Sequence, residues 1–445
     1  MELKKGYKQT EIGVIPESWE LKKIYEFASI NGRVGWKGYT KKDLVENGPY
    51  AIGAKHINKD NKLDLSEPTC LSYEKFAESP EIKVFINDIL IVQRGTIGKL
   101  VFIDREIGDA TINPSMLILR SKNASQSYIY YFLNSFEGQK QIILDTSSTG
   151  VPMITQKQVL NFKIPLPTFS EQQAIATVLS DTDQLIQNLK ILIIKKKAIK
   201  QGAMQELLTG KKRLKGFTEE WETKKLGSSG KTISGLSGKT KTDFGSGNAR
   251  YITFMNVMSN VVIDTSILEK VNIKQGETQN TFKKGDLFFN TSSETPEEVG
   301  MCAVLLDDIQ DVYLNSFCFG YRLNNEELNG LYLSYLINSN VGRSIFESLA
   351  QGATRYNLSK TNFNNVILNV PKDIKEQQAI AQILSDMDAE IVALEQQLHK
   401  TQALKQGMMQ ELLTGKTRLV QPSYSQYELS AIAAEPKTSY TKNST

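Results

Sequence analysis

Apolar residues recur every three or four positions in two long segments of the chain, which predicts two amphipathic helices. The repeating apolar positions are Ile175, Leu179, Ile186 and Leu189 in the first segment and Ile380, Leu384, Ile391 and Leu394 in the second. Steps of four and three form a heptad seam, which is typical of helices that pack on each other. We therefore expect a pair of helices of about 40 residues each, roughly 60 Å long at about 1.5 Å per residue.

The two helices are copies of one sequence. EQQAIATVLSDTD begins at Glu171 and EQQAIAQILSDMD at Glu376, 205 residues later, with ten identities in thirteen positions. At the same offset, QGAMQELLTGKKRL from Gln201 and QGMMQELLTGKTRL from Gln406 match at twelve of fourteen positions. Between these blocks the heptad phase is kept although most identities are lost. This favours two helices that pack together over two unrelated amphipathic helices in separate domains.

Both helix ends carry capping signals. At the starts, Ser170 with Gln173 and Asp373 with Glu376 have the spacing of capping boxes. A glycine follows the LLT of each copy, as is typical of a helix C-cap. These glycines are Gly210 and Gly415.

A block with both strand-like and helix-like segments precedes each long helix. Runs of β-branched and aromatic residues predict strands in VFIDREIG, ATINPSMLILRS, YITFMNVM and FCFGYRL, whereas YIYYFLNSFEGQKQIIL and LYLSYLINSNVGRSIFESL predict helices. The blocks are weakly similar to each other, as in ESWELKKI at Glu17 and EEWETKKL at Glu219. They are therefore predicted to share one fold while their loops differ.

The predicted fold class is α+β, with two mixed α/β domains and two long helices in a pseudo-two-fold internal repeat. The predicted segments are a first domain over 1–166, a helical region over 167–212, a second domain over 213–371, a helical region over 372–419 and a tail over 420–445. The tail is rich in Ser, Thr, Tyr and Pro and is predicted to be disordered.

Composition indicates a cytoplasmic protein. Of 445 residues, 40% are apolar, and the net charge of +4 permits a nucleic-acid partner without requiring one. The three cysteines show no CxxC spacing, which suits a reducing compartment. The N-terminus lacks the apolar core of a signal peptide, and no apolar run approaches the eighteen residues of a membrane span.

The sequence predicts no catalytic residue, metal site or bound cofactor. Only two histidines occur, His56 and His399, which disfavours a histidine metal site or a Ser–His–Asp relay. GSSGKT and GLSGKT resemble a P-loop, but Lys225 and Ile233 stand where the motif needs its first glycine. A binding or assembly protein is therefore favoured over an enzyme.

Polar loops in both blocks carry side chains suited to base edges and phosphates. In the first block the candidates are Lys55, His56, Asn58, Gln93, Arg94, Thr96, Lys99, Thr155, Gln156 and Lys157. In the second block they are Lys239, Lys241, Arg250, Asn256, Asn290, Thr291, Ser292, Ser293, Arg355, Tyr356, Asn357 and Lys360. For any single Lys or Arg, and for the run Lys195–Lys197, the alternative is a solvated charge, and for Tyr356 it is a place in the core. Two such domains, held on a helix pair of fixed length, would suit binding to DNA, whose helical repeat is about 34 Å.

This order of blocks and helices resembles the specificity (S) subunit of type I restriction–modification enzymes. The resemblance is carried by EQQAIAxxLSDxD…QELLTGKxRL after each block, by GVIPESW from Gly13 and by IPLPTFSEQQ from Ile164, and it covers residues 1 to about 419. The second junction, NVPKDIKEQQ, is one residue longer, which we interpret as a loop adjustment.

The resemblance implies two target recognition domains, separated by conserved helices that form an antiparallel coiled coil. Each domain would read one half of a bipartite, asymmetric target in double-stranded DNA. The helices would set the spacer and dock two methyltransferase (modification) subunits, which recruit the restriction/translocase subunits. S-adenosylmethionine, ATP and Mg²⁺ would belong to those partners and none to this chain.

Three alternatives stay open on sequence alone. The chain could be the recognition subunit of another restriction–modification type, a coiled-coil adaptor without a DNA role, or an enzyme with hidden carboxylate chemistry. An adaptor needs no second, differently surfaced copy of a domain, so the divergent loops disfavour it.

Overall fold

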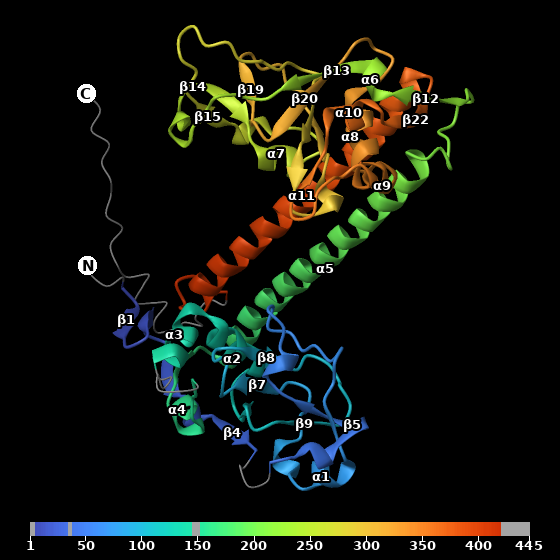
Figure 1. Ribbon diagram of the computed structural model, residues 1–445. Helices are drawn as coiled ribbons and strands as arrows, with labels where there is room; N and C mark the ends of the chain where they lie inside the picture. The colour runs from blue at the N-terminus through green and yellow to red at the C-terminus, as the bar shows by residue number, and fades with distance from the viewer. Residues whose placement is uncertain (1–4, 34–37, 145–151, 420–445) are drawn as a thin grey trace, which may run out of the picture. The chain divides into compact units, whose positions relative to one another are not determined.

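The computed structural model describes residues 5–33, 38–144 and 152–419, so the predicted disorder of 420–445 concerns residues outside this part. The chain forms two compact units. Unit 1 joins the chain up to Asn188 to the chain from Leu398 onward, and unit 2 spans Leu189–Gln397. The long helices α5 (Phe169–Leu207) and α11 (Ile374–Leu412) each contribute one part to unit 1 and the other part to unit 2 (Figure 1).

Unit 1 is built on a four-stranded and a three-stranded sheet. The four-stranded sheet has the order β4 (Ala28–Gly32), β10 (Met116–Ser121), β7 (Ile89–Val92), β8 (Leu100–Phe102). The three-stranded sheet has the order β6 (Cys70–Leu71), β5 (Leu44–Ile52), β9 (Ala110–Ile112). Two pairs complete the strands: β1 (Tyr7–Thr10) with β2 (Gly13–Pro16), and β3 (Glu20–Lys23) with β11 (Lys163–Leu166). The shorter helices are α1 (Tyr73–Ala77), α2 (Gln126–Asn134), α3 (Phe136–Leu144) and α4 (Gln156–Leu160).

Unit 2 repeats this plan. Its four-stranded sheet is β13 (Gly230–Ser234), β20 (Cys318–Leu323), β16 (Leu287–Asn290), β18 (Cys302–Val304), and its three-stranded sheet is β15 (Glu269–Val271), β14 (Phe244–Ile252), β19 (Val312–Leu314). Two pairs follow: β12 (Trp221–Lys225) with β22 (Ile367–Pro371), and β17 (Ser292–Ser293) with β21 (Tyr356–Asn357). The helices are α6 (Leu226–Ser229), α7 (Phe254–Ser259), α8 (Gly330–Asn338), α9 (Asn340–Ser348) and α10 (Lys360–Asn364).

The shared topology confirms the predicted α+β fold with an internal repeat. In both units the central strand of the three-stranded sheet pairs antiparallel on one side and parallel on the other. A short repeat that the sequence analysis missed precedes this strand: GYTKKD from Gly38 and GKTKTD from Gly238, 200 residues apart. In each copy the aspartate accepts hydrogen bonds from the threonine, Thr40 to Asp43 and Thr240 to Asp243.

The heptad positions pack into the cores of the units as well as along the helix pair. Ile175 and Leu179 are buried in the core of unit 1 together with Leu412 from the end of α11. Ile380 and Leu384 are buried in the core of unit 2 together with residues from the end of α5. Leu189 and Ile391 are also buried, whereas Ile186 and Leu394 are half-buried.

Polar contacts fix the direction of the helices within each unit. In unit 1, Lys405 of α11 pairs with Asp183 of α5 at 2.6 Å, and Arg418 just beyond α11 pairs with Glu171. Residue numbers therefore fall along one helix as they rise along the other, which is an antiparallel arrangement. Unit 2 shows the same direction, with Lys200 on Asp388 and Arg213 on Glu376.

The run Lys195–Lys197, whose simplest interpretation was a solvated face, also takes part in this pairing. Lys196 lies 2.6 Å from Glu390 and Lys197 lies 2.7 Å from Glu395. Both ion pairs remain partly exposed, so they add orientation more than stability.

The predicted capping boxes are wrong in detail. Thr168, not Ser170, caps α5, because its hydroxyl accepts from the Glu171 amide at 3.3 Å. Asp373 does cap α11, accepting from the Lys375 amide at 2.8 Å, but the Glu376 carboxylate binds Arg213 instead of closing the box. The glycine C-caps are confirmed, since Gly210 and Gly415 both have φ of 70°.

Each long helix predicted within the two blocks is two helices in the structure. Ser135 separates α2 from α3, and Ser339 separates α8 from α9. The serine hydroxyl accepts from the amide three residues on, which ends one helix and caps the next. A glycine makes the tight corner possible, because a Cβ on Gly138 would lie 2.2 Å from the carbonyl oxygen of Phe132. The predicted strand YITFMNVM is also partly wrong, since Thr253 caps helix α7 there.

Candidate nucleic-acid interface

Five predicted contact residues are buried by the fold. His56 is 3% exposed, Asn256 and Asn290 are 0% exposed, Ser292 is 5% exposed and Ser293 is 7% exposed. Asn290 donates to the carbonyl oxygens of Ser292 and Glu298 and accepts from the Met301 amide at 2.7 Å, so both ends of its side-chain amide fix the loop after β16. This burial speaks against direct base contact by these side chains.

Asn256 and His56 hold loops in a similar way. The Asn256 amide bonds both the N–H and the carbonyl of Asp264, at 3.0 and 2.8 Å. His56 Nδ1 accepts from the Gly53 amide at 2.9 Å, and burial lowers the pKa of its imidazole, which favours the neutral form. Sequence composition alone suggests surface donors at these positions, whereas in the structure both side chains bond backbone groups of their own loops.

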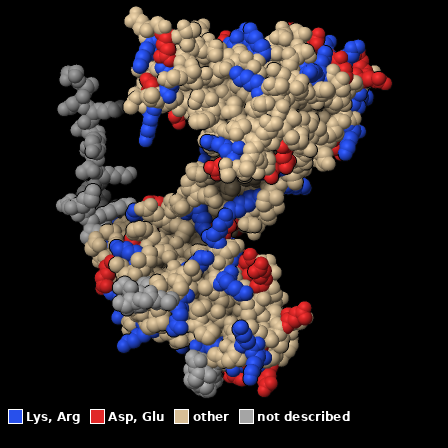
Figure 2. All heavy atoms as spheres, viewed as in Figure 1, with Lys and Arg blue, Asp and Glu red and all other residues tan. Residues whose placement is uncertain are grey.

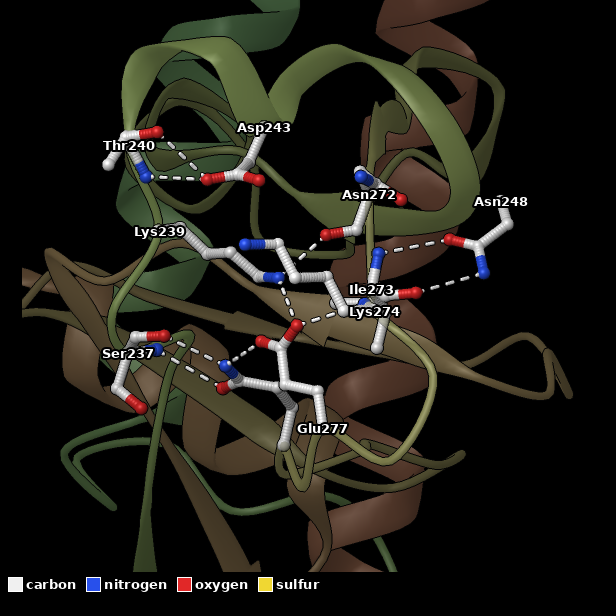
Figure 3. Close-up of polar contacts among 10 residues, drawn as sticks. Ser237, Lys239, Thr240, Asp243, Asn248, Asn272, Ile273, Lys274 and Glu277 are labelled. Atoms are coloured by element: carbon white, nitrogen blue, oxygen red, sulfur yellow. Dashed lines mark hydrogen bonds and ion pairs between the residues drawn. The ribbon is translucent and has the colours of Figure 1, made fainter.

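Lys239 is also withdrawn from the surface, as Figure 3 shows. Its side chain is 4% exposed and its ammonium donates to the Glu277 carboxylate and to the Asn272 carbonyl, both at 2.6 Å. Glu277 also accepts from the Lys274 amide at 2.9 Å and from Gln279, so the pKa of its carboxyl is lowered to about 2, chiefly by Lys239. These contacts tie the loop before β14 to the loop after β15.

In unit 1, the structure brings two of the predicted loops together. The loop after β7, with Arg94 and Thr96, meets the start of α4, where Thr155 is the N-cap and Lys157 lies in the first turn. Arg94 forms a β-bridge with Met153, and the Ile154 amide donates to the Gln93 carbonyl at 2.9 Å. The side chains that stay exposed in unit 1 are Lys55, Arg94, Thr96, Thr155, Gln156 and Lys157, and those that are half-buried are Asn58, Gln93 and Lys99.

All three half-buried side chains have internal partners. Lys99 donates to the Ile57 carbonyl at 3.2 Å, Gln93 donates to the Pro114 carbonyl at 2.7 Å, and Asn58 accepts from the Asp60 and Lys62 amides at 2.9 and 3.0 Å. These side chains therefore hold the loops of unit 1 in place. The exposed group around Arg94 and Lys157 is the better candidate surface in unit 1.

In unit 2, the corresponding loops converge in the same way. The loop after β16 pairs with the segment before α10 through β17 and β21, where Ser292 lies opposite Asn357 and Ser293 opposite Tyr356. Arg355 and Asn357 are exposed, and Thr291 and Tyr356 are half-buried. Lys360 is exposed and donates to Ser234 Oγ at 3.0 Å.

Phe317 belongs to this surface and was missed from the sequence. Phe317 is 53% exposed, its ring centre lies 5.8 Å from the Arg355 guanidinium, and its carbonyl accepts from the Thr291 hydroxyl at 2.8 Å. An aromatic in the run NSFCF looks like a strand residue on sequence alone. Exposed aromatic and guanidinium planes together can stack on a base.

The remaining predicted residues of unit 2, Lys241 and Arg250, are exposed on the three-stranded sheet and the turn before it. In the face shown in Figure 2, basic side chains occur on both units with acidic ones between them. This face therefore carries separate basic side chains and not one continuous basic patch.

Within residues 5–33, 38–144 and 152–419, no group of His, Cys, Asp and Glu is arranged to hold a metal ion. Over the same part of the chain, none of the helices combines the length and apolarity needed to cross a bilayer.

Comparison with known proteins identifies relatives for both halves of the chain. The family model "Type I restriction modification DNA specificity domain" matches twice, over residues 16–196 and 218–406. The putative type I restriction enzyme MjaX specificity subunit of Methanocaldococcus jannaschii is 26% identical over 441 residues, covering 93% of this chain and 97% of the relative. The MjaVIII specificity subunit of the same organism is 24% identical, covering 91% and 94%.

Solved structures share the fold. The type I restriction–modification S subunit from M. genitalium superposes with a TM-score of 0.56 at 14% identity, covering 93% of this chain and 98% of that chain. A chain from a study of complex assembly and conformational transition of the type I R-M system gives a TM-score of 0.53 at 13% identity, covering 91% and 99%.

Proposed function

Because the chain belongs to the family of type I restriction modification DNA specificity domains, we propose that it reads a bipartite, asymmetric DNA target as the specificity subunit of a type I restriction–modification complex. Unit 1, with the domain predicted over 1–166, reads one half of the target. Unit 2, with the domain predicted over 213–371, reads the other half. The chain itself performs no catalysis.

One observation carries this proposal: equivalent loops converge in both units but present different side chains. Unit 1 places Arg94, Thr96 and Lys157 at this surface. Unit 2 places Thr291, Arg355 and Phe317 there. A repeated frame with divergent exposed donors is what reading two different half-sites requires, since base edges specify sequence through donor and acceptor patterns.

The helices serve in assembly under this proposal. Gln205 and Glu206 are exposed on α5, and the identical pair Gln410 and Glu411 is exposed at the matching place on α11. Packing does not require identity at exposed positions, whereas docking two copies of one partner does. The partner is a DNA methyltransferase subunit, which supplies S-adenosylmethionine chemistry, and the ATP- and Mg²⁺-dependent restriction subunits join through the complex.

Base-resolution mapping of adenine methylation tests the proposal. The genome is compared with and without this gene, and with the gene restored. We expect deletion to remove methylation at one bipartite, asymmetric motif and restoration to return it. An unchanged methylation map together with no DNA binding by the purified chain would contradict the proposal. Methylation or cleavage by the purified chain alone would show that it is an enzyme in its own right.

A further inference from the structure

Two basic side chains face each other across β14 and β15 in unit 2. The strand register places Arg250 directly opposite Lys270, and both residues are exposed. Residues directly opposite in an antiparallel pair project from the same face with Cβ atoms about 4.5–5.5 Å apart, and like charges there destabilise the sheet. Strand pairing alone therefore does not explain two cations at these opposite positions.

Neighbouring acids do not neutralise this pair. Glu269, next to Lys270, accepts from the Tyr251 hydroxyl at 2.9 Å, and Tyr251 lies on the other face of β14. Glu277 is occupied by Lys239 at 2.6 Å (Figure 3). Among the ion pairs of the described residues, none includes Arg250 or Lys270.

The three-stranded sheet does not require charged residues at these positions. In unit 1 the equivalent strand β5 places Tyr50 between Cys70 of β6 and Ala110 of β9. In unit 2, Arg250 lies between Lys270 and Val312. The same three-stranded sheet is therefore built with a neutral pair at this position in unit 1, so the two cations of unit 2 reflect something other than folding.

The strands that carry the pair are held rigidly. Asn248, two residues before Arg250, bonds both the N–H and the carbonyl of Ile273, at 3.0 and 3.1 Å. The Lys239–Glu277 contact ties the next segment to the loop before β14. Both cations therefore lie on a braced surface, which reduces the entropy lost when they bind a ligand.

We propose that Arg250 and Lys270 form an anion site that binds a phosphate of the DNA backbone at the half-site read by unit 2. This inference rests on the proposed DNA-reading function. A guanidinium gives a phosphate two parallel hydrogen bonds, and an ammonium adds a point charge beside it. A phosphate contact fixes register on the duplex without reading sequence, so unit 1 can use other groups at its own half-site.

Salt-dependent DNA binding by the full-length chain tests the site. The probe is a synthetic duplex carrying the motif identified by the methylation map, titrated between about 50 and 200 mM salt. Wild type is compared with R250Q/K270Q, with the charge-retaining R250K/K270R, and with K372Q/K375Q as a control. The control removes the same charge from the start of α11, where both lysines are exposed.

For R250Q/K270Q we expect roughly tenfold weaker binding at low salt and a salt slope smaller by about 1 to 2 in magnitude. R250K/K270R and the control should keep the wild-type slope. The site would be overturned if R250Q/K270Q kept the wild-type affinity and salt slope, or if R250K/K270R lost as much affinity and slope as R250Q/K270Q. Either result would leave the proposed function intact. Failure of the wild-type chain to bind the duplex would also overturn the site, and together with an unchanged methylation map it would contradict the proposed function.

Discussion

The carboxylate of Glu171, at the start of α5, is held by the guanidinium of Arg418, which follows α11 and lies 247 residues later in the chain. Arg418 donates from Nη2 to Oε2 at 2.7 Å and from Nε to Oε1, and Trp19 Nε1 donates to Oε2 at 3.3 Å. Glu171 is 1% exposed. In unit 2, Arg213 holds Glu376 with the same two bonds, at 2.6 and 2.7 Å. The end of each helix copy is thus fastened to the start of the other.

Replacing Arg418 with Met is expected to destabilise unit 1 by about 2–4 kcal/mol, because a buried carboxylate then loses its charged partner. The double variant E171Q/R418M should recover part of that loss, since no charge is left buried. Chemical denaturation with amide exchange of the α5 start measures both. K416M, which removes an exposed neighbouring cation, is the control. Equal stability of wild type and R418M would show that the contact contributes nothing.

Acid should open the loop after β15 before it unfolds unit 2. The Glu277 carboxyl has its pKa lowered from 4.5 to about 2, chiefly by Lys239. Its ionised form stabilises the folded loop above the ordinary pKa, and this contribution is lost as pH falls through the lowered value. We expect amide exchange at Ile273 and Lys274, corrected for the intrinsic pH dependence, to rise between about pH 4.5 and pH 2.

The variant E277Q provides the matched comparison for this loop, because it keeps the shape of the side chain without the titrating group. Its corrected exchange should be faster than wild type at neutral pH and flat across the same window. A wild-type loop whose protection does not change with acid would show that the Lys239–Glu277 contact does not hold it.

Exchange of residues 1–166 for the equivalent block of a relative with another target should change one half of the recognised motif only. The reason is that the exposed donors around Arg94 and Lys157 belong to this block, whereas those around Arg355 belong to the other. Methylation mapping of cells that carry the hybrid gives the answer directly. Changes in both halves would contradict separate reading by the two units.

Local periodicity was enough to predict the helices, because burial along a helix depends on neighbours three and four residues away. Ile175, Leu179, Ile380 and Leu384 are all buried as their spacing indicates. The corners at Ser135 and Ser339 escaped prediction, since apolar residues continue across them and only the serine and glycine geometry breaks the helix.

Much of the candidate site depends on how each loop folds back on itself and on which strands pair, which explains the misses. Asn256 and Asn290 are residue types that suit adenine recognition, but the side-chain amide of each donates to a backbone carbonyl of its own loop. Lys239 is indistinguishable from Lys241 by composition, yet only Lys239 meets Glu277. Lys270 gains its significance from strand register, which places it opposite Arg250.

The helix pair should set the number of unread base pairs between the two half-sites. The unit boundary crosses α5 after Asn188 and α11 after Gln397. Four residues inserted at both places leave the pairs within each unit intact, including Lys405 with Asp183 and Lys200 with Asp388. The insertion adds about 6 Å of helix, close to two base pairs of duplex length, so the spacer in the methylation map should lengthen by about two.

An insertion in α5 alone is the informative comparison, because it lengthens one helix against an unchanged partner. The contacts of one unit must then slip by a turn or the helix must buckle, so we expect lower stability and loss of methylation, not a new spacer. The double insertion should restore methylation at the longer spacer. If the double insertion instead methylates the original motif with full efficiency, helix length does not set the spacing and the two units must be positioned on DNA by other contacts.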